Sequence, residues 1–524
     1  MGSNVEGGNT NQPGLLQQCR SAHSPTFSGQ YCQVFLRQGS VQYFVGICVP
    51  DSCVEEEVQM LVLYELYMHH TSISIPLAAT LYTAIIRWQR NREVSPTAES
   101  SCLNTDRTSH TPPCVPRSCV YRCLQVFSLQ TTSQGVFSTS SSIPGGGYSS
   151  LNGIRVLSLL WIICGHSAQF PVINNLDNYK NWRTTVESSP LYVLTISGPV
   201  FLAVDTFLLL GGLLSARSLL EALDYICDLK LMYMLALSVF CSRIQPLHLF
   251  IMCLTIGLIS LVKWGPYWFP FIDTLMDCKT YWWANLLLIS NLLPVHEICI
   301  PWTWYLSLDF QCYATTPLLY FFLNLPVFQP TSENYVLYYY VKPYTRYGPF
   351  LIGILTGIYL TTKKDQLLKQ KWQAALGWFC CLSLMAVLVG LAYILRETPA
   401  HLSVPHALYQ GLHRPLWALA VTWIILACEE GYGGKPRSLL SLDFWVPLSN
   451  ISFACYLTHP VFIILYIGLQ ETPIHYTDIN FMYLFLGHLV LTLVVSYVFT
   501  VLIEKPYLLL KWIHCIPLPS FPSY

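Results

Sequence analysis

Long hydrophobic segments recur along most of the chain, separated by short polar connections. Runs of this length predict membrane-spanning helices. The expected spans cover residues 154–170, 192–214, 246–262, 304–323, 348–361, 374–395, 415–428, 447–467 and 481–503. A shorter apolar run lies at 281–295, and another at 73–86 directly precedes the basic sequence RWQRNR. The pattern predicts an all-α polytopic membrane protein with about ten transmembrane helices.

The composition agrees with this prediction. Of the 524 residues, 53% are hydrophobic and only 11% are charged, whereas soluble domains carry about a quarter charged residues. The formal net charge is zero, and no basic stripe with interleaved aromatic residues is present, which argues against nucleic-acid binding. We therefore expect membrane lipids, and no nucleic acid, among the partners.

Polar stretches between the apolar runs suggest the domain organisation. The expected parts are a Cys-containing extracytoplasmic domain, a first membrane segment, a cytosolic linker, the main membrane domain and a tail, at residues 1–60, 61–90, 91–150, 151–506 and 507–524. Basic residues mark cytosolic loops, so RWQRNR places the linker in the cytosol and the N-terminal domain on the other side. Lysines and arginines mark two further cytosolic loops, 363–371 and 435–437. The first residues lack the apolar core of a signal peptide.

Two sets of cysteines are candidates for disulfides. The N-terminal set is even in number and consists of Cys19, Cys32, Cys48 and Cys53. Disulfides are the favoured interpretation, with free thiols as the alternative, and no histidine lies at the spacing of a zinc site. Cys278 and Cys299 flank the short run 281–295. We predict an extracytoplasmic disulfide there, which would make this segment a re-entrant hairpin; two unrelated buried thiols are the alternative.

An arginine and a histidine interrupt the apolar sequence LNGIRVLSLLWIICGHS. Arg155 and His166 are eleven positions apart, which at about 100° per residue returns a helix to nearly the same face. Along the helix axis they are separated by about 16 Å, half of a bilayer core. Arg155 alone would be a residue that sets membrane topology, and Arg243 in SRIQP has the same alternative interpretation.

Three more ionisable residues lie within expected spans, where each is costly and therefore a functional candidate. They are Asp205, Asp309 and His459. We expect Asp205 to lie about 14 Å from the cytosolic end of its span, and the other two about 20 Å from the cytosol. Either carboxylate could instead hold helices together or orient a histidine, and His459 could be an interhelical hydrogen-bond partner.

These residue types suggest acyl transfer at the middle of the membrane. A guanidinium at the membrane surface suits a phosphate-bearing donor, because it binds phosphate through two parallel hydrogen bonds. A histidine midway along the helix suits general-base catalysis on a hydroxyl. A thioester donor could thread its pantetheine arm from Arg155 toward His166. Secondary transporters also place polar groups at the midplane, but no pair of matching Gly/Pro-broken spans is present.

Several motifs resemble those of the membrane-bound acyltransferase 3 family, in its animal branch with a nose-resistant-to-fluoxetine-type N-terminal domain. The residues that carry the resemblance are 151–167, VDTF at 204–207, SRIQP at 242–246, WTWYLSLDFQCY at 302–313, KPYTRYGPFLIGILTGIYL at 342–360, HRPLWAL at 413–419, LSNISFACYLTHP at 448–460 and EKPY at 504–507, with GQYC and GICVPDSC in the N-terminal domain. Where the family has Ser-Gly after VDTF, this chain has Gly211-Gly212.

The resemblance implies a membrane-bound O-acyltransferase that transfers an acyl group from acyl-CoA, as co-substrate, to a hydroxyl acceptor such as a lipid or other small molecule. The implied site comprises candidate catalytic residues and candidate donor-binding residues, and it needs no metal. The catalytic candidates are His166, Asp205, Asp309 and His459, and the donor-binding candidates are Arg155 and Arg243. The expected location is the endoplasmic reticulum or the plasma membrane.

One segment departs from the family pattern. Residues 324–347 carry Pro, Glu, Lys and Arg throughout and cannot cross a membrane as a helix, although family members fit a span there. A missing span would invert the later helices, which the lysine-marked loops resist. We therefore expect the chain to misinsert or to bury a strained 324–347 connection, to express poorly and to show little acyl transfer. A non-catalytic protein that transports or senses lipids, or an inactive paralogue or splice form, is the alternative function.

Overall fold

The structure is a computed structural model that describes residues 23–24, 27–38, 41–50, 126–137, 148–174, 176, 178, 182, 199–223, 229–261, 269–294, 297–322, 341–363, 366–395, 404–470 and 474–511. The chain divides into two compact units, Met1–Ile75 and Pro76–Tyr524. The expected first membrane segment at 61–90 and most of the linker at 91–150 lie outside the described residues.

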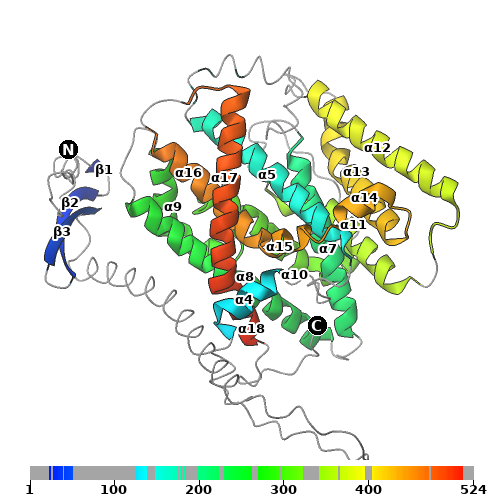
Figure 1. Ribbon diagram of the computed structural model, residues 1–524, viewed down its shortest axis with the longest axis horizontal. Helices are drawn as coiled ribbons and strands as arrows, with labels where there is room; N and C mark the ends of the chain where they lie inside the picture. Colours follow the sequence, from blue (N-terminus) through cyan, green and yellow to red (C-terminus); the bar gives the residue numbers. More distant parts are fainter. Residues whose placement is uncertain are drawn as a thin grey trace, which may run out of the picture. The chain divides into compact units, whose positions relative to one another are not determined.

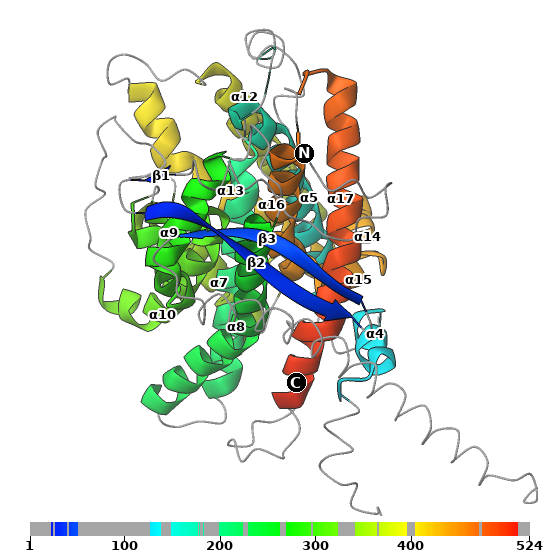
Figure 2. The same cartoon turned by 90° about the vertical axis from the view of Figure 1, so that its left-hand side faces the viewer.

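The first unit contains a small antiparallel sheet in the order β1-β2-β3. Its strands are β1 (His23–Ser24), β2 (Phe27–Gln38) and β3 (Val41–Pro50). The register runs from Gly29 opposite Pro50 to Gln38 opposite Val41, so two residues separate the long strands, as in the commonest hairpins. Figure 2 shows β2 and β3 as a twisted ribbon. The prediction of an all-α protein is therefore wrong for this unit, where strands had not been foreseen.

The second unit is helical throughout the described residues (Figure 1). Its longer helices are α4 (Leu129–Phe137), α5 (Ser150–Asn174), α7 (Phe201–Leu223), α8 (Leu229–Leu261), α9 (Phe269–Leu286), α10 (Trp304–Phe322), α11 (Pro343–Thr362), α12 (Lys371–Ile394), α13 (Val404–Glu429), α16 (Ser452–Gly468) and α17 (Asp478–Phe499). Shorter pieces are the 3-10 turns η3 (Ser290–Leu292) and η5 (Pro301–Thr303), the helices α14 (Gly434–Leu440), α15 (Trp445–Asn450) and α18 (Lys505–Lys511), and the π-helical segment η7 (Thr500–Glu504).

Five of the described helices are long and apolar enough to cross a membrane, which confirms that the chain is a helical membrane protein. These stretches are Ser150–Pro171, Phe201–Leu220, Lys371–Ile394, Val404–Glu429 and Asp478–Leu510. Two shorter apolar stretches, Arg243–Leu258 and Ser452–Gly468, accompany them. At the rim of the bundle, α12 packs on α13 and leaves large side chains such as Phe379 exposed, as expected of a helix that faces lipid (Figure 1).

Contacts at the start of α5 show how the helices are oriented. The Ser150 hydroxyl donates to Glu429 at the end of α13, and the Tyr148 hydroxyl donates to the carbonyl of Leu360 near the end of α11. The Arg217 guanidinium, in the last turns of α7, lies 5.2 Å from the centre of the Tyr148 ring. The helices α7, α11 and α13 therefore end where α5 begins, and run antiparallel to it.

Small residues let α7 and α11 approach closely. Gly353 of α11 lies against Leu209 of α7, and Gly357 lies against Leu213. The two helices therefore run in the same direction. On α7, Gly212 lies against the carbonyl of Phe350, where a Cβ atom would overlap the backbone. Glycines four residues apart at a helix contact are typical of tightly packed membrane helices. This parallel pair forms one wall of the bundle.

The later helices are not inverted relative to α5. Arg155 contacts Ser449 at one end of α5, and His166 contacts His459 eleven residues further along, so α5 and α16 run parallel. The loop that begins at Lys363 lies at the same end of the bundle as the start of α5, because Lys363 pairs with Glu430 next to the end of α13. Helix directions thus agree with the lysine-marked loops, and most of 324–347 lies outside the described residues.

Candidate functional site

Two histidines from distant parts of the chain meet between α5 and α16. The Nδ1 atom of His166 lies 2.8 Å from Nε2 of His459, and the two ring planes are nearly parallel, at 14°, with their centres 5.1 Å apart. Phe170, one turn further along α5, stacks on the His166 ring at 5.2 Å. The parallel course of the two helices brings the histidines together, and the hydrogen bond and the Phe170 ring limit how far the His166 ring can rotate.

The hydrogen-bond partners determine the tautomer of both rings when they are neutral. The Nδ1 atom of His459 lies 2.9 Å from the carbonyl oxygen of Cys455, which can only accept, so Nδ1 carries the proton. Nε2 of His459 is then an acceptor, and Nδ1 of His166 must donate to it. This leaves Nε2 of His166 as an unprotonated nitrogen with a lone pair, which is the form that a general base requires.

Arg155 lies near the start of α5, eleven residues before His166, and contacts α15. Its Nη1 donates to the Ser449 hydroxyl over 3.1 Å. The charge of Arg243 on α8 acts on Arg155, and also on Asp309 and Glu504. The two predicted donor-binding arginines are therefore within electrostatic reach of each other, and Arg243 is exposed.

Asp309 lies on α10 and faces the middle of α7. A Cβ atom built on Gly211 would lie 2.8 Å from Oδ1 of Asp309, so the carboxylate packs directly against the glycine backbone. Tyr305, one turn earlier on α10, is within electrostatic reach of both Asp309 and Arg155. The position where the family has a serine hydroxyl thus faces Asp309 in this chain.

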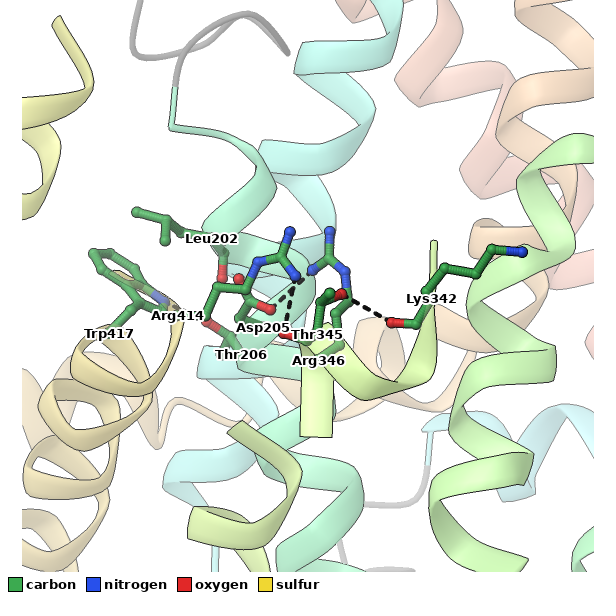
Figure 3. A network of polar contacts seen from close by, with 8 residues as sticks. All are labelled: Leu202, Asp205, Thr206, Lys342, Thr345, Arg346, Arg414 and Trp417. Atoms are coloured by element: carbon green, nitrogen blue, oxygen red, sulfur yellow. Dashed lines mark hydrogen bonds and ion pairs between the residues drawn. The ribbon is translucent and has the colours of Figure 1, made fainter. Parts of the chain in front are cut away.

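Asp205 forms a different site, fully buried between α7, α11 and α13 (Figure 3). Its Oδ1 accepts from Nη1 of Arg346 over 2.8 Å, and Arg414 donates from Nη1 to the carbonyl of Thr345 over 3.0 Å. The expected depth of Asp205 is wrong, because α7 continues to Leu223 and places this residue eighteen positions, or about 27 Å, from that end. Asp205 pairs with arginine, and His459 takes the orienting role that a carboxylate had been expected to fill.

Further polar residues around these sites were not foreseen from the sequence. Next to His166, the Ser167 hydroxyl lies 3.2 Å from Nδ1 of the buried His488. The Tyr456 hydroxyl donates to the carbonyl of Trp302 over 2.5 Å and ties α16 to the turn before α10. Arg346 and Arg414 stand in motifs already noted, and a charge within an apolar run was the signal that could have singled them out.

The cysteine predictions have different outcomes. Cys278 and Cys299 form the predicted disulfide, which joins α9 to the segment before η5. In the N-terminal sheet, Cys32 lies opposite Ile47 and Cys48 opposite Tyr31 in the register. Cys19 and Cys53 lie outside the described residues, so the disulfides of that domain stay a prediction. Within the described part of the chain, no three His, Cys, Asp or Glu side chains are placed to hold a metal ion.

The fold and these sites define an integral membrane protein with a histidine pair buried among its helices. The chain belongs to the acyltransferase 3 family: the family model described as an acyltransferase domain matches residues 148–501. It is 29% identical over 420 residues to nose resistant to fluoxetine protein 6 of Caenorhabditis elegans, a match that covers 68% of this chain. The chain spans about half the length of that relative, since the match covers 50% of it. No solved structure matches the chain.

Proposed function

We propose that the protein is a membrane-embedded O-acyltransferase in which His166 is the general base. The observation that supports this most directly is the hydrogen-bonded series from the Cys455 carbonyl through His459 to His166, which leaves Nε2 of His166 available to accept a proton. Membership of the acyltransferase 3 family supports the reaction class.

In the proposed reaction, Nε2 of His166 removes the proton from the acceptor hydroxyl as its oxygen attacks the acyl carbonyl carbon. The imidazolium is stabilised by its hydrogen bond to His459, which itself donates to a carbonyl. Collapse of the tetrahedral intermediate breaks the bond to the leaving group. The proton on His166 then passes to that leaving group, which restores the neutral ring.

We propose acyl-CoA as the donor, with its phosphates bound at Arg155 and Arg243. Arg155 and His166 are separated by about 16 Å along α5, a distance that an extended pantetheine arm spans. Phosphate groups match the fork of a guanidinium. The Ser449 hydroxyl orients the guanidinium of Arg155 by accepting a hydrogen bond from it. The side chain of Asp309, which faces the middle of α7, would then assist the acceptor or the leaving group.

The proposed topology follows the basic loops. The start of α5, the end of α13 and the loop at Lys363 share one end of the bundle, and we place this end in the cytosol, in the endoplasmic reticulum or plasma membrane. The donor site then opens to the cytosol, where acyl-CoA is found. The Cys-containing N-terminal domain lies on the opposite side.

The test compares three variants of the purified full chain in nanodiscs. His166→Ala is expected to bind acyl-CoA as the wild type does and to transfer no acyl group. Arg155→Ala is expected to lose most of the donor affinity, a few kcal/mol for a charge-assisted contact, and Arg155→Lys to retain part of it. His475→Ala, in the exposed loop after α16, is the matched control and should leave transfer unchanged.

Two results would contradict the proposal. Acyl transfer that persists in His166→Ala would remove this residue from the chemistry, and equal donor binding by wild type and Arg155→Ala would remove the arginine from the donor site. Specific lipid movement or lipid binding without any acyl turnover by the wild type would favour the alternative of a lipid transporter or lipid sensor.

A further inference from the structure

Two buried arginines lie side by side, Arg346 near the start of α11 and Arg414 on α13. Figure 3 shows the guanidinium groups of Arg346 and Arg414 next to each other, with Asp205 beneath them. All three side chains are at most 1% exposed. Charged groups are costly in a low-dielectric interior and are kept there for a structural or functional reason.

Two acceptor atoms beside these arginines have no hydrogen bond within the described part of the chain. One is Oδ2 of Asp205, whose other oxygen binds Arg346. The other is Nε2 of His413, which precedes Arg414 on α13. Nδ1 of His413 lies 2.6 Å from the carbonyl of Tyr409 and carries the proton, so Nε2 is an acceptor in the neutral ring. Buried acceptors of this kind normally bind a donor, such as a hydroxyl.

This cluster is separate from the histidine site. Trp304 stacks on Arg346 at 5.1 Å and stands edge-on to Tyr305, so an aromatic layer lies between the arginine pair and the Tyr305–Asp309 side. Along the helices the cluster belongs to the end opposite Arg155, because Asp205 is near the start of α7, which runs antiparallel to α5. In the proposed topology this is the extracytoplasmic half, which an acceptor can enter without crossing the donor site.

We propose that Arg346 and Arg414 bind the anionic group of the acyl acceptor, which is a hydroxyl compound carrying one carboxylate or phosphate. This inference rests on the proposed function, whose substrate class it narrows. Paired guanidinium forks match the oxygen atoms of either group. A hydroxyl of the same compound then has Oδ2 of Asp205 as its acceptor.

The experiment measures thermal unfolding of the full chain in phosphatidylcholine nanodiscs, with sn-glycerol 3-phosphate or glycerol as probe. We expect the phosphate to raise the Tm of the wild type in a saturable manner and glycerol to leave it unchanged. Arg414→Gln should weaken this effect about tenfold or more. Asp205→Asn should unfold at a lower temperature than wild type, because Arg346 loses its counter-ion, and yet gain more from the phosphate.

Controls separate this proposal from acyl transfer and from general charge effects. His166→Ala should respond to the phosphate as the wild type does, so the outcome is independent of the proposed chemistry. Arg437→Gln, at the exposed surface of α14, should also respond normally. The same measurement is repeated in nanodiscs that contain phosphatidylglycerol. If this lipid raises the Tm and glycerol 3-phosphate then has no further effect, the lipid headgroup is the source of the anion.

The proposal is overturned if neither probe nor anionic lipid changes the Tm of the wild type. It is also overturned if Arg414→Gln responds to the phosphate as the wild type does, since Arg414 would then take no part in binding. If Arg414→Gln fails to fold, Arg414→Lys provides the comparison, because lysine keeps the charge but loses the fork and should bind the phosphate more weakly.

Discussion

Among single residues, His459 has the most specific structural role. Its ring is fully buried, its Nδ1 donates to the Cys455 carbonyl, and its Nε2 accepts a hydrogen bond from Nδ1 of His166. In the proposed reaction it is a positioning residue that holds His166 in one tautomer, as the carboxylate does in a hydrolase triad. A neutral ring suits this depth, because a buried carboxylate would carry a desolvation cost.

His459→Ala should lower kcat for acyl transfer about 10²–10⁴-fold, because His166 loses the acceptor that fixes its tautomer. The KM for the donor should change little, since Arg155 is untouched. His459→Gln retains a side-chain oxygen that can accept from His166, and we expect it to recover part of kcat. Steady-state kinetics check this prediction, and equal kcat values for the Ala and Gln variants would contradict it.

Gly211 and Gly212 of α7 differ in how much room their neighbours leave for an added side chain. Gly211→Ser should fold normally, because the added atoms meet the movable carboxylate of Asp309, to which the new hydroxyl can donate. Gly212→Ala should lose about 1–3 kcal/mol of stability or more, since its Cβ would overlap the carbonyl of Phe350. Thermal unfolding of both variants in one detergent is the measurement. Equal destabilisation would show that the contact with Asp309 is as rigid as the contact with the backbone.

At the scale of the elements, Glu430 fastens the loop between α11 and α12. Its carboxylate accepts from the amides of Leu367 and Leu368 over 3.1 and 2.8 Å, and from the Tyr359 hydroxyl over 3.2 Å. Lys363 lies 3.5 Å away. Burial acts to raise the pKa of Glu430, but these amide donors, the charge of Lys363 and the Tyr359 hydroxyl outweigh it and lower the pKa.

Because the folded-state pKa of Glu430 is lowered, its contribution to loop stability is present above the ordinary glutamate pKa of about 4.3 and is lost as pH falls through the lowered value. Hydrogen exchange at the Leu367 and Leu368 amides, corrected for intrinsic rates, should therefore stay slow from neutral pH down to that range and then accelerate. Glu430→Gln should exchange fast throughout. An unchanged protection in this variant would show that the carboxylate does not hold the loop.

For the molecule as a whole, helix direction determines which loops share a side. The loop after α16 contacts the loop after α5, because Leu176 bridges to Ile474 and Asn178 donates to the Tyr476 carbonyl over 3.0 Å. Both lie at the end of the bundle away from Lys363 and Glu430. The structure thus groups the connections into two sets, one at each end.

Cysteines introduced at Lys435 and His475 should react from opposite sides of the membrane. Both positions are exposed, and they lie at the two different ends of the bundle. In sealed inside-out vesicles, a membrane-impermeant maleimide should label Lys435→Cys and should label His475→Cys only after permeabilisation. The parent protein without added cysteines is the control. Labelling of both variants in sealed vesicles would contradict the orientation of α13 relative to α16.

The sequence identified most of the individual candidates but not their grouping. Charges within apolar runs are visible in one dimension, so Arg155, His166 and His459 could be singled out. Their pairing could not, since the two histidines are 293 residues apart and meet only because α5 and α16 run parallel. Arg346 was missed because Lys342 and prolines nearby suggested a loop, whereas Pro343 is in fact the first residue of α11.

Helix boundaries were the least predictable feature. The span expected at 192–214 corresponds to α7 at Phe201–Leu223, which continues past Arg217, the residue that suggested the end of the span. Arg217 is accommodated because its guanidinium stacks on Tyr148. The direction of the later helices could not be inferred from hydropathy. Helix direction depends on the path of the chain before the helix, and hydropathy does not give that path.

Because of the π-helical segment η7, the orientation of the side chains after α17 depends on the number of residues in this segment. A π turn holds one more residue than an α turn, so Thr500–Glu504 amounts to an insertion that the helix absorbs without breaking. It also sets the rotation of the residues at its end: Glu504 is buried, with its carboxylate accepting from Thr500, and Lys505 is the next residue. Removing a single residue here would restore a regular helix but turn Glu504 by about 100° away from its buried position. A one-codon deletion in this segment would therefore change the rotation of every described residue that follows it.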